Sequence, residues 1–175
     1  AIDRQKTETV HWHAVFTASR AEKKVRDRLE ELGVECFLPV QTVLRQWTYR
    51  KSRVVVPVIA GLVFVRVGRQ EQVKVLQTKG VVAFLRLKGE AGAAVIPDKQ
   101  MEDFRFLLDF SEEAVEMTNE NIKAGDLVRV VKGSLRGMEG ELIRHKGVTK
   151  VLVRIDMLGC AMVNIPASFV EKLNK

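Results

Sequence analysis

The chain has 175 residues, enough for one medium-sized domain or two small ones. Hydrophobic residues make up 46% of it, which is sufficient for packed cores, and no apolar run is long enough to cross a membrane. Lysine and arginine total 29 against 22 aspartate and glutamate, and the net charge of +7 favours a polyanionic partner such as nucleic acid.

The two cysteines, Cys36 and Cys160, are far apart in the sequence. Isolated thiols are typical of a reducing cytoplasm rather than of a disulfide scaffold, so we expect a cytoplasmic protein. The histidines are too few and too scattered for a metal site, and no Gly-rich phosphate loop is present. The sequence therefore predicts no cofactor and no catalytic site. The histidines are His11, His13 and His145.

Residues 1–10 are polar and lack the apolar core of a signal peptide, so we expect an N-terminal tail. Residues 11–19 then indicate a first strand that contains Trp12 and Phe16. Ser19 and Glu22 have the spacing of a capping box, which predicts the start of a helix. Its apolar positions repeat at helical spacing up to a terminating glycine. They are Ala21, Val25, Leu29 and Leu32, followed by Gly33.

The middle of the chain alternates strands and helices. Residues 34–40 indicate a short strand interrupted by Pro39, and residues 61–67 indicate another. Between them, residues 42–47 and 54–58 predict a hairpin whose tip, residues 48–53, is long and basic. The cations of the tip are Arg50, Lys51 and Arg53.

Further along, residues 70–77 have a weak helical pattern and residues 81–87 are strand-like. Pro97 and Asp98 mark a helix start, and the apolar stripe after them predicts a helix. The absence of a sustained βαβ repeat favours an α+β sandwich with an antiparallel sheet. Residues 111–121 are acidic and thinly apolar, as expected for an interdomain linker.

The most specific pattern is the segment 125–142, GDLVRVVKGSLRGMEGEL, which we call the glycine motif. A turn at its start is followed by alternating valines, then by three glycines that can supply positive φ and close backbone approach. Any small antiparallel barrel also needs Gly-rich corners, so this simpler interpretation stays open. With residues 148–172 the motif predicts five short strands in an SH3-like barrel. Its defining residues are Gly125, Asp126, Val128, Val130, Gly133, Gly137 and Gly140, and the predicted core is Val128, Val130, Leu142, Val151 and Val153.

The glycine motif resembles the KOW motif of ribosomal proteins and NusG-type elongation factors. The N-terminal segments decide between these two, because they follow the order found in NusG proteins. They are Trp12, the FLP of residues 37–39, VPVIAGLVFV of 56–65, KGVVAFLRL of 79–87 and VIP of 95–97. The chain therefore resembles the NusG family, with an NGN domain over residues 11–110, a linker over 111–121 and a KOW domain over 122–175.

This resemblance implies a non-enzymatic transcription elongation or antitermination regulator. It would bind the clamp of RNA polymerase and the upstream non-template DNA, and so suppress pausing or termination. By position, the polymerase-binding face would comprise Phe16, Ile59, Leu62 and Phe64, although Phe64 also suits a core position. The DNA-binding residues would be Arg20, Lys23, Lys24 and Arg26, with the hairpin tip as a second candidate patch. A charged solvent-facing side is the simplest alternative for these cations.

One departure from the family lies at residues 60–62, which read Ala-Gly-Leu where Pro-Gly-Tyr is usual. The charge and the lack of an inserted domain resemble a specialised paralogue, such as RfaH or the UpxY antiterminators of surface polysaccharide operons. Unlike RfaH, the chain keeps its glycines and β-branched strands, so we expect a stable barrel. The KOW domain would recruit NusE or Rho, and we expect a monomer without membrane contact.

Two other functions fit less of the sequence. A ribosomal or RNA-binding KOW protein accounts for the barrel and the charge, but it leaves the first 110 residues unexplained. RNA is also the competing partner of the predicted KOW domain, because that half of the chain is basic. An enzyme is disfavoured, because neither cysteine has an evident histidine partner.

Overall fold

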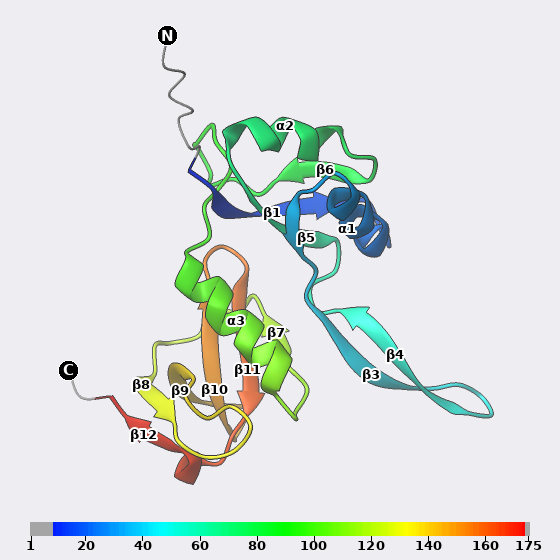
Figure 1. Cartoon of the computed structure of the whole chain (residues 1–175). Helices are drawn as coiled ribbons and strands as arrows, with labels where there is room; N and C mark the ends of the chain where they lie inside the picture. Colours follow the sequence, from blue (N-terminus) through cyan, green and yellow to red (C-terminus); the bar gives the residue numbers. More distant parts are fainter. Residues whose placement is uncertain (1–8, 174–175) are drawn as a thin grey trace. The chain divides into compact units, whose positions relative to one another are not determined.

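The computed structural model describes residues 9–173, so the predicted N-terminal tail, residues 1–10, lies almost entirely outside the described residues. The contacts divide the chain into two compact units (Figure 1). The first unit comprises the residues up to Leu38 together with Ala60–Pro97, and the second comprises Pro39–Ile59 together with the residues from Asp98 onward. Both are built on antiparallel sheets, and helices accompany them, so the predicted mixed α and β class is confirmed.

The first unit contains a four-stranded antiparallel sheet in the order β2-β5-β1-β6. Its central strands are β1 (His11–Thr17) and β5 (Leu62–Val67), and six residue pairs join them from His11 opposite Val67 to Phe16 opposite Leu62. The outer strands are β2 (Glu35–Phe37) and β6 (Val81–Phe84). Ile96 adds a single antiparallel bridge to Trp12.

Two helices belong to this unit, α1 (Glu22–Glu31) and α2 (Arg69–Gln77). Helix α1 buries Val25 and Leu29 as predicted, and it ends before Gly33, whose φ of +75° suits the glycine. The predicted capping box of Ser19 and Glu22 is wrong. Ala21 is the N-cap, and the Glu22 carboxylate instead accepts a hydrogen bond from the Gly61 amide at 2.8 Å. The carboxylate stabilises the turn before β5 rather than the start of its own helix.

The second unit contains a six-stranded antiparallel sheet in the order β12-β8-β9-β10-β11-β7. Five of the strands follow residue 120, as the sequence predicts. They are β8 (Asp126–Val130), β9 (Glu139–His145), β10 (Val148–Ile155), β11 (Gly159–Asn164) and β12 (Val170–Lys172), with a 3-10 turn at Ala167–Phe169 before the last.

The sixth strand, β7 (Glu116–Thr118), falls inside the predicted linker. It pairs with β11, where Met117 lies opposite Ala161, and the neighbouring Val115 is buried. Part of the acidic segment 111–121 is therefore an edge strand and not a free connection. The acidic composition concealed it, because an edge strand needs few apolar side chains.

Helix α3 (Asp98–Phe110) also packs within the second unit. Its predicted apolar stripe is confirmed, since Met101, Phe104 and Leu107 are buried. The helix lies against β10, and the Gln100 side chain both donates to Asp156 Oδ1 at 2.9 Å and accepts from the Asp156 amide at 2.8 Å. The contacts thus group α3 with the C-terminal strands, whereas the sequence prediction groups it with residues 11–97. The domain boundaries at 110 and 121 stay a prediction.

Strands β3 (Val40–Gln46) and β4 (Lys51–Pro57) form a separate two-stranded sheet, which we call the basic hairpin (Figure 1). The predicted hairpin is confirmed, but its tip is shorter than expected. Strand pairing extends to Gln46 opposite Lys51, and only the residues from Trp47 to Arg50 form the turn. At the base, the Gln41 side chain bonds both main-chain groups of Val115, at 3.1 and 3.2 Å.

Candidate functional site

The sheet of the first unit has an aromatic face. Residues directly opposite on antiparallel strands point to the same side, so Phe16 and Leu62 share a face. Phe64, two residues after Leu62 on β5, is on the same face and lies opposite Phe37 of β2. The Phe64 and Phe37 rings stack with centroids 6.2 Å apart. Helix α1 lies on the other side of the sheet, where the Cys36 thiol reaches the Arg26 carbonyl at 3.7 Å.

The four predicted polymerase-binding residues differ in accessibility. Phe16 is 40% exposed, whereas Leu62 and Phe64 are 2% and 0% exposed. Ile59 is half-buried and belongs to the second unit. The burial of Phe64 agrees with its alternative as a core residue, and Leu62 lies in register with Phe16 as its support. The accessible member of the aromatic face is therefore Phe16.

The predicted DNA-binding cations lie on and just before helix α1. Lys23 and Lys24 are exposed, and Arg20 is exposed at a positive φ of 59° ahead of the helix. Arg26 is half-buried and forms an ion pair with the neighbouring Asp27 at 3.1 Å. This pairing offsets part of the charge of Arg26.

The glycines of the motif have two different physical roles. Gly133 and Gly137 have φ of +84° and +95°, the left-handed region that side chains disfavour. Gly125 and Gly140 instead allow close packing. A Cβ on Gly125 would collide with the Leu142 carbonyl, and one on Gly140 would lie 2.9 Å from the Leu152 carbonyl. Both roles anticipated from the sequence are present.

The core of the second unit agrees with the predicted one except at one position. Val128, Val130, Val151 and Val153 are buried. Leu142 is only half-buried, although it lies opposite the buried Val151 and shares its face; the next residue, Ile143, is buried on the other face of the sheet. Ile143 packs in a cluster with partly buried Ile122 against it; the buried members are Ile143, Leu152, Cys160 and Met162.

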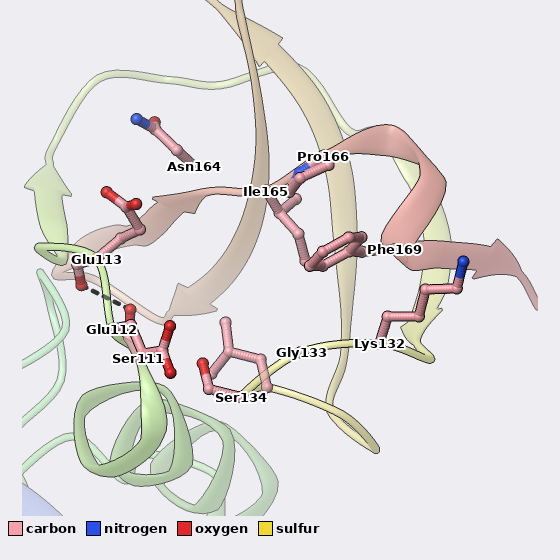
Figure 2. A pocket seen from close by; sticks show the side chains of 11 residues that line it. Ser111, Glu112, Glu113, Lys132, Gly133, Ser134, Asn164, Ile165, Pro166 and Phe169 are labelled. Carbon is pink, nitrogen blue, oxygen red and sulfur yellow. Dashed lines mark hydrogen bonds between the residues drawn. The ribbon is translucent and has the colours of Figure 1, made fainter.

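A cavity of about 230 Å³ lies beside the glycine motif in the second unit (Figure 2). Lys132 is on one side of it and the carboxylates of Glu112 and Glu113 are on the other. The Ser111 hydroxyl donates to the Glu113 carbonyl at 2.6 Å. A carbonyl oxygen is not a general base, so this serine is not activated as a nucleophile.

The comparisons with known proteins decide the family. The family model described as "Transcription termination factor nusG" matches residues 10–105, more than half of the chain. The protein belongs to the NusG family. The match covers the whole sheet of the first unit, both of its helices and the basic hairpin. A comparison with curated sequences gives no match.

A solved structure supports this fold. The structure described as "Domain interaction in Thermotoga maritima NusG" has 23% identity and a TM-score of 0.50, and the match covers 94% of this chain and 98% of that one. The MjSpt4:Spt5 complex in conformation B matches at 18% identity with a TM-score of 0.29, over 94% and 97% of the two chains. Membership of the NusG family implies a role in the regulation of transcription elongation.

NusG-family proteins are transcription factors. The titratable groups His13 and Cys36 of this member have shifted pKa values. Burial lowers the pKa of His13, which lies 2.9 Å from the Ala94 carbonyl through Nδ1. Burial also raises the pKa of Cys36 to about 11, so its thiol stays protonated near neutral pH and is a poor nucleophile. Residues 9–173 contain no cluster suited to a metal ion and no helix long and apolar enough to cross a membrane.

Two polar contacts of the NusG-family fold were not anticipated from the sequence. Glu141 joins Arg154 in an ion pair on neighbouring strands, and Gln100 joins Asp156 across 56 residues. Neither pair has a sequence signal, because each depends on which strands and helices become neighbours.

Proposed function

We propose that this protein is a transcription elongation and antitermination regulator that binds the clamp of RNA polymerase and the upstream non-template DNA. The observation that carries the proposal is the family match over residues 10–105, which contains the aromatic face and helix α1 together. By suppressing pausing or termination, such a protein extends transcription of its operons. We further propose that it is a specialised paralogue, similar to RfaH or UpxY, that serves operons such as those for surface polysaccharides.

The polymerase contact is assigned to Phe16 together with Leu62 and Phe64 on the same face of the sheet, and Ile59 is included from its sequence position alone. Phe16 is the accessible aromatic side chain of this set, and a buried aromatic anchor is a common centre of binding energy. The missing Pro-Gly-Tyr triplet at residues 60–62 removes one aromatic group from the expected contact. The remaining affinity would then rest more heavily on Phe16.

The DNA contact is assigned to Arg20, Lys23, Lys24 and Arg26. Contacts to phosphate give affinity without sequence readout, which suits a regulator that travels with polymerase. Each phosphate contact that is lost lowers the slope of log affinity against log salt by roughly 0.9 for duplex DNA. A Lys23→Ala, Lys24→Ala double variant should therefore show a shallower slope, and an unchanged slope would remove α1 from this assignment.

For the C-terminal strands we propose an SH3-like KOW barrel that recruits a protein such as NusE or Rho. The positive φ of Gly133 and Gly137 and the close approaches at Gly125 and Gly140 support the KOW assignment. RNA is the competing partner, because the loops of this half carry exposed cations such as Lys146. Titration of the labelled protein with NusE, Rho and RNA would separate these partners, and resonance shifts from RNA alone would argue against protein recruitment.

The experiment that tests the main proposal is capture of polymerase from cell extract on the immobilised full chain. Nuclease treatment removes any association that is bridged by nucleic acid. We expect polymerase to be retained after the treatment. Retention of ribosomal proteins instead would favour the alternative of a ribosomal or RNA-binding KOW protein.

A further inference from the structure

The basic hairpin carries more than half of the net charge of the protein. Between Val40 and Pro57 it has four cations and no acidic residue, which amounts to +4 of the total +7. Among the described residues none of the four forms an ion pair, although cations elsewhere do, for example Arg154 with Glu141. Their charge is therefore available to a ligand. The four are Arg45, Arg50, Lys51 and Arg53.

Strand pairing places two of these cations on one surface. Gln46 lies opposite Lys51 and Leu44 lies opposite Arg53, so Lys51 and Arg53 share one face of the hairpin. That face is exposed along its length, whereas Val43 and Val54 on the other face are half-buried. Arg45 lies opposite Ser52 on the other face, and Arg50 belongs to the turn. Lys51 and Arg53 are two residues apart, which separates them by about 6.6–6.8 Å along the strand. Each can then contact a different phosphate.

The turn adds aromatic side chains beside these cations. Tyr49, the only tyrosine of the chain, is 97% exposed. Trp47 is one of two tryptophans and is 48% exposed, and its Nε1–H donates to the Ser52 hydroxyl at 2.7 Å. This bond fixes one edge of the indole and leaves part of the ring accessible. Exposing a tyrosine so completely forgoes the stabilisation that its burial would provide.

We propose that the tip of the basic hairpin binds single-stranded nucleic acid, with bases stacked on Tyr49 and Trp47 and phosphates held by Arg50, Lys51 and Arg53. A surface that combines aromatic faces with unpaired cations matches the chemistry of single-strand binding. A duplex would use the cations but would keep its bases stacked on one another, away from the tyrosine. The hairpin site uses different residues from the α1 cations, and it does not depend on polymerase binding.

The test uses the full chain and fluorescence anisotropy with labelled twelve-residue oligonucleotides. The probes are (dT)12, (rU)12 and a mixed-sequence DNA duplex, and the first two distinguish DNA from RNA as the source of the single strand. Tyr49→Ala should weaken binding of at least one single strand by about 5- to 100-fold and leave duplex binding unchanged. Tyr49→Phe keeps the stacking surface and should bind as the unmodified protein does.

The contribution of charge is tested separately. Arg50→Gln with Lys51→Gln should lower the salt slope for single strands by about 1.4, the value for two phosphate contacts. A matched control replaces two exposed lysines elsewhere, Lys88→Gln with Lys123→Gln, and should leave the slope unchanged. The proposal is overturned if Tyr49→Ala binds single strands as tightly as the unmodified protein. It is also overturned if duplex DNA, anionic vesicles or an acidic peptide is the only ligand bound.

Discussion

Arg154 and Glu141 form a two-pronged ion pair between β10 and β9, with Nε to Oε2 at 2.7 Å and Nη2 to Oε1 at 3.1 Å. The same arginine donates to the Ile122 carbonyl at 2.7 Å, and the same carboxylate accepts from the Gly125 amide at 3.1 Å. The pair therefore fastens the segment that precedes the glycine motif to the middle of the sheet.

The first prediction concerns this ion pair. Arg154→Met should lower the free energy of unfolding of the second unit by about 1–3 kcal/mol, because it leaves a mostly covered carboxylate without its charged donor. Arg154→Lys keeps the charge but not the two-pronged geometry, so its free energy of unfolding should lie between those of the unmodified protein and Arg154→Met. Arg129→Met is the control, since the Arg129–Glu139 pair is exposed and contributes little. Equal losses for Arg154→Met and Arg129→Met in urea unfolding would contradict the prediction.

The second prediction concerns close packing in the glycine motif. Gly125→Ala should destabilise the second unit by about 1–3 kcal/mol, because the new Cβ collides with the Leu142 carbonyl and forces β8 away from β9. Gly92→Ala is a suitable control, since its Cβ would enter open space. Thermal unfolding followed by circular dichroism measures both. A Gly125→Ala protein as stable as the control would show that the strands can separate at no cost.

The third prediction concerns pH. The pKa of His13 is lowered from 6.5 in the folded chain by burial, so below pH 6.5 the unfolded chain binds a proton that the folded chain refuses. The free energy of unfolding of the first unit should therefore fall as the pH drops below 6.5, until the folded pKa is passed. His13→Asn keeps a donor for the Ala94 carbonyl but cannot titrate. Its melting temperature should depend less on pH between 7 and 5.5 than that of the unmodified protein.

The fourth prediction concerns the polymerase contact. Phe16→Ala should weaken polymerase binding by about 1–4 kcal/mol, the usual range for an interface anchor. Leu76→Ala is the matched control, because Leu76 is a similarly exposed apolar residue on α2. Leu62→Ala is a less clean test, because it opens a cavity under Phe16 and can act through stability. Equal polymerase affinities for the Phe16 and Leu76 variants would show that the polymerase contact lies on another face.

The fifth prediction concerns the limits of the C-terminal unit. A fragment that starts at residue 120 lacks β7 and α3, and so exposes the edge of β11 and the apolar side of β10. A fragment of residues 98–175 retains both and should be the more stable of the two, with the better dispersed NMR spectrum. The opposite order would show that α3 and β7 contribute nothing to this unit.

The sequence predicts most of the elements of the fold, because their signals are local. Alternation at Val128 and Val130, helical spacing of Val25 and Leu29, and the glycines of the motif all depend on neighbours within a few residues. The predictions fail where a residue bonds or pairs with a partner far away in the sequence. Glu22 bonds Gly61 rather than capping its helix, and acidic Glu116 enters a strand because β11 offers an edge.

The candidate site is less predictable than the fold. Sequence position places Leu62 and Phe16 together, and the strand register agrees, but only the three-dimensional packing shows that Leu62 is covered and Phe16 is not. The same applies to the basic hairpin. Its cations are visible in the sequence, whereas the exposure of Tyr49 and the bond from Trp47 to Ser52 depend on how long the turn is.

The bonds between Gln41 and Val115 have a consequence for the order of events during synthesis. The two residues are 74 positions apart, and the ribosome adds about 5–20 residues each second. The hairpin strand therefore leaves the ribosome on the order of 4–15 s before the segment that satisfies its glutamine exists. Throughout that interval the two strands of the hairpin have only each other as partners, and a lone hairpin is marginally stable. The nascent chain then carries an unpaired edge, which is the period when a chaperone would be of most use to it.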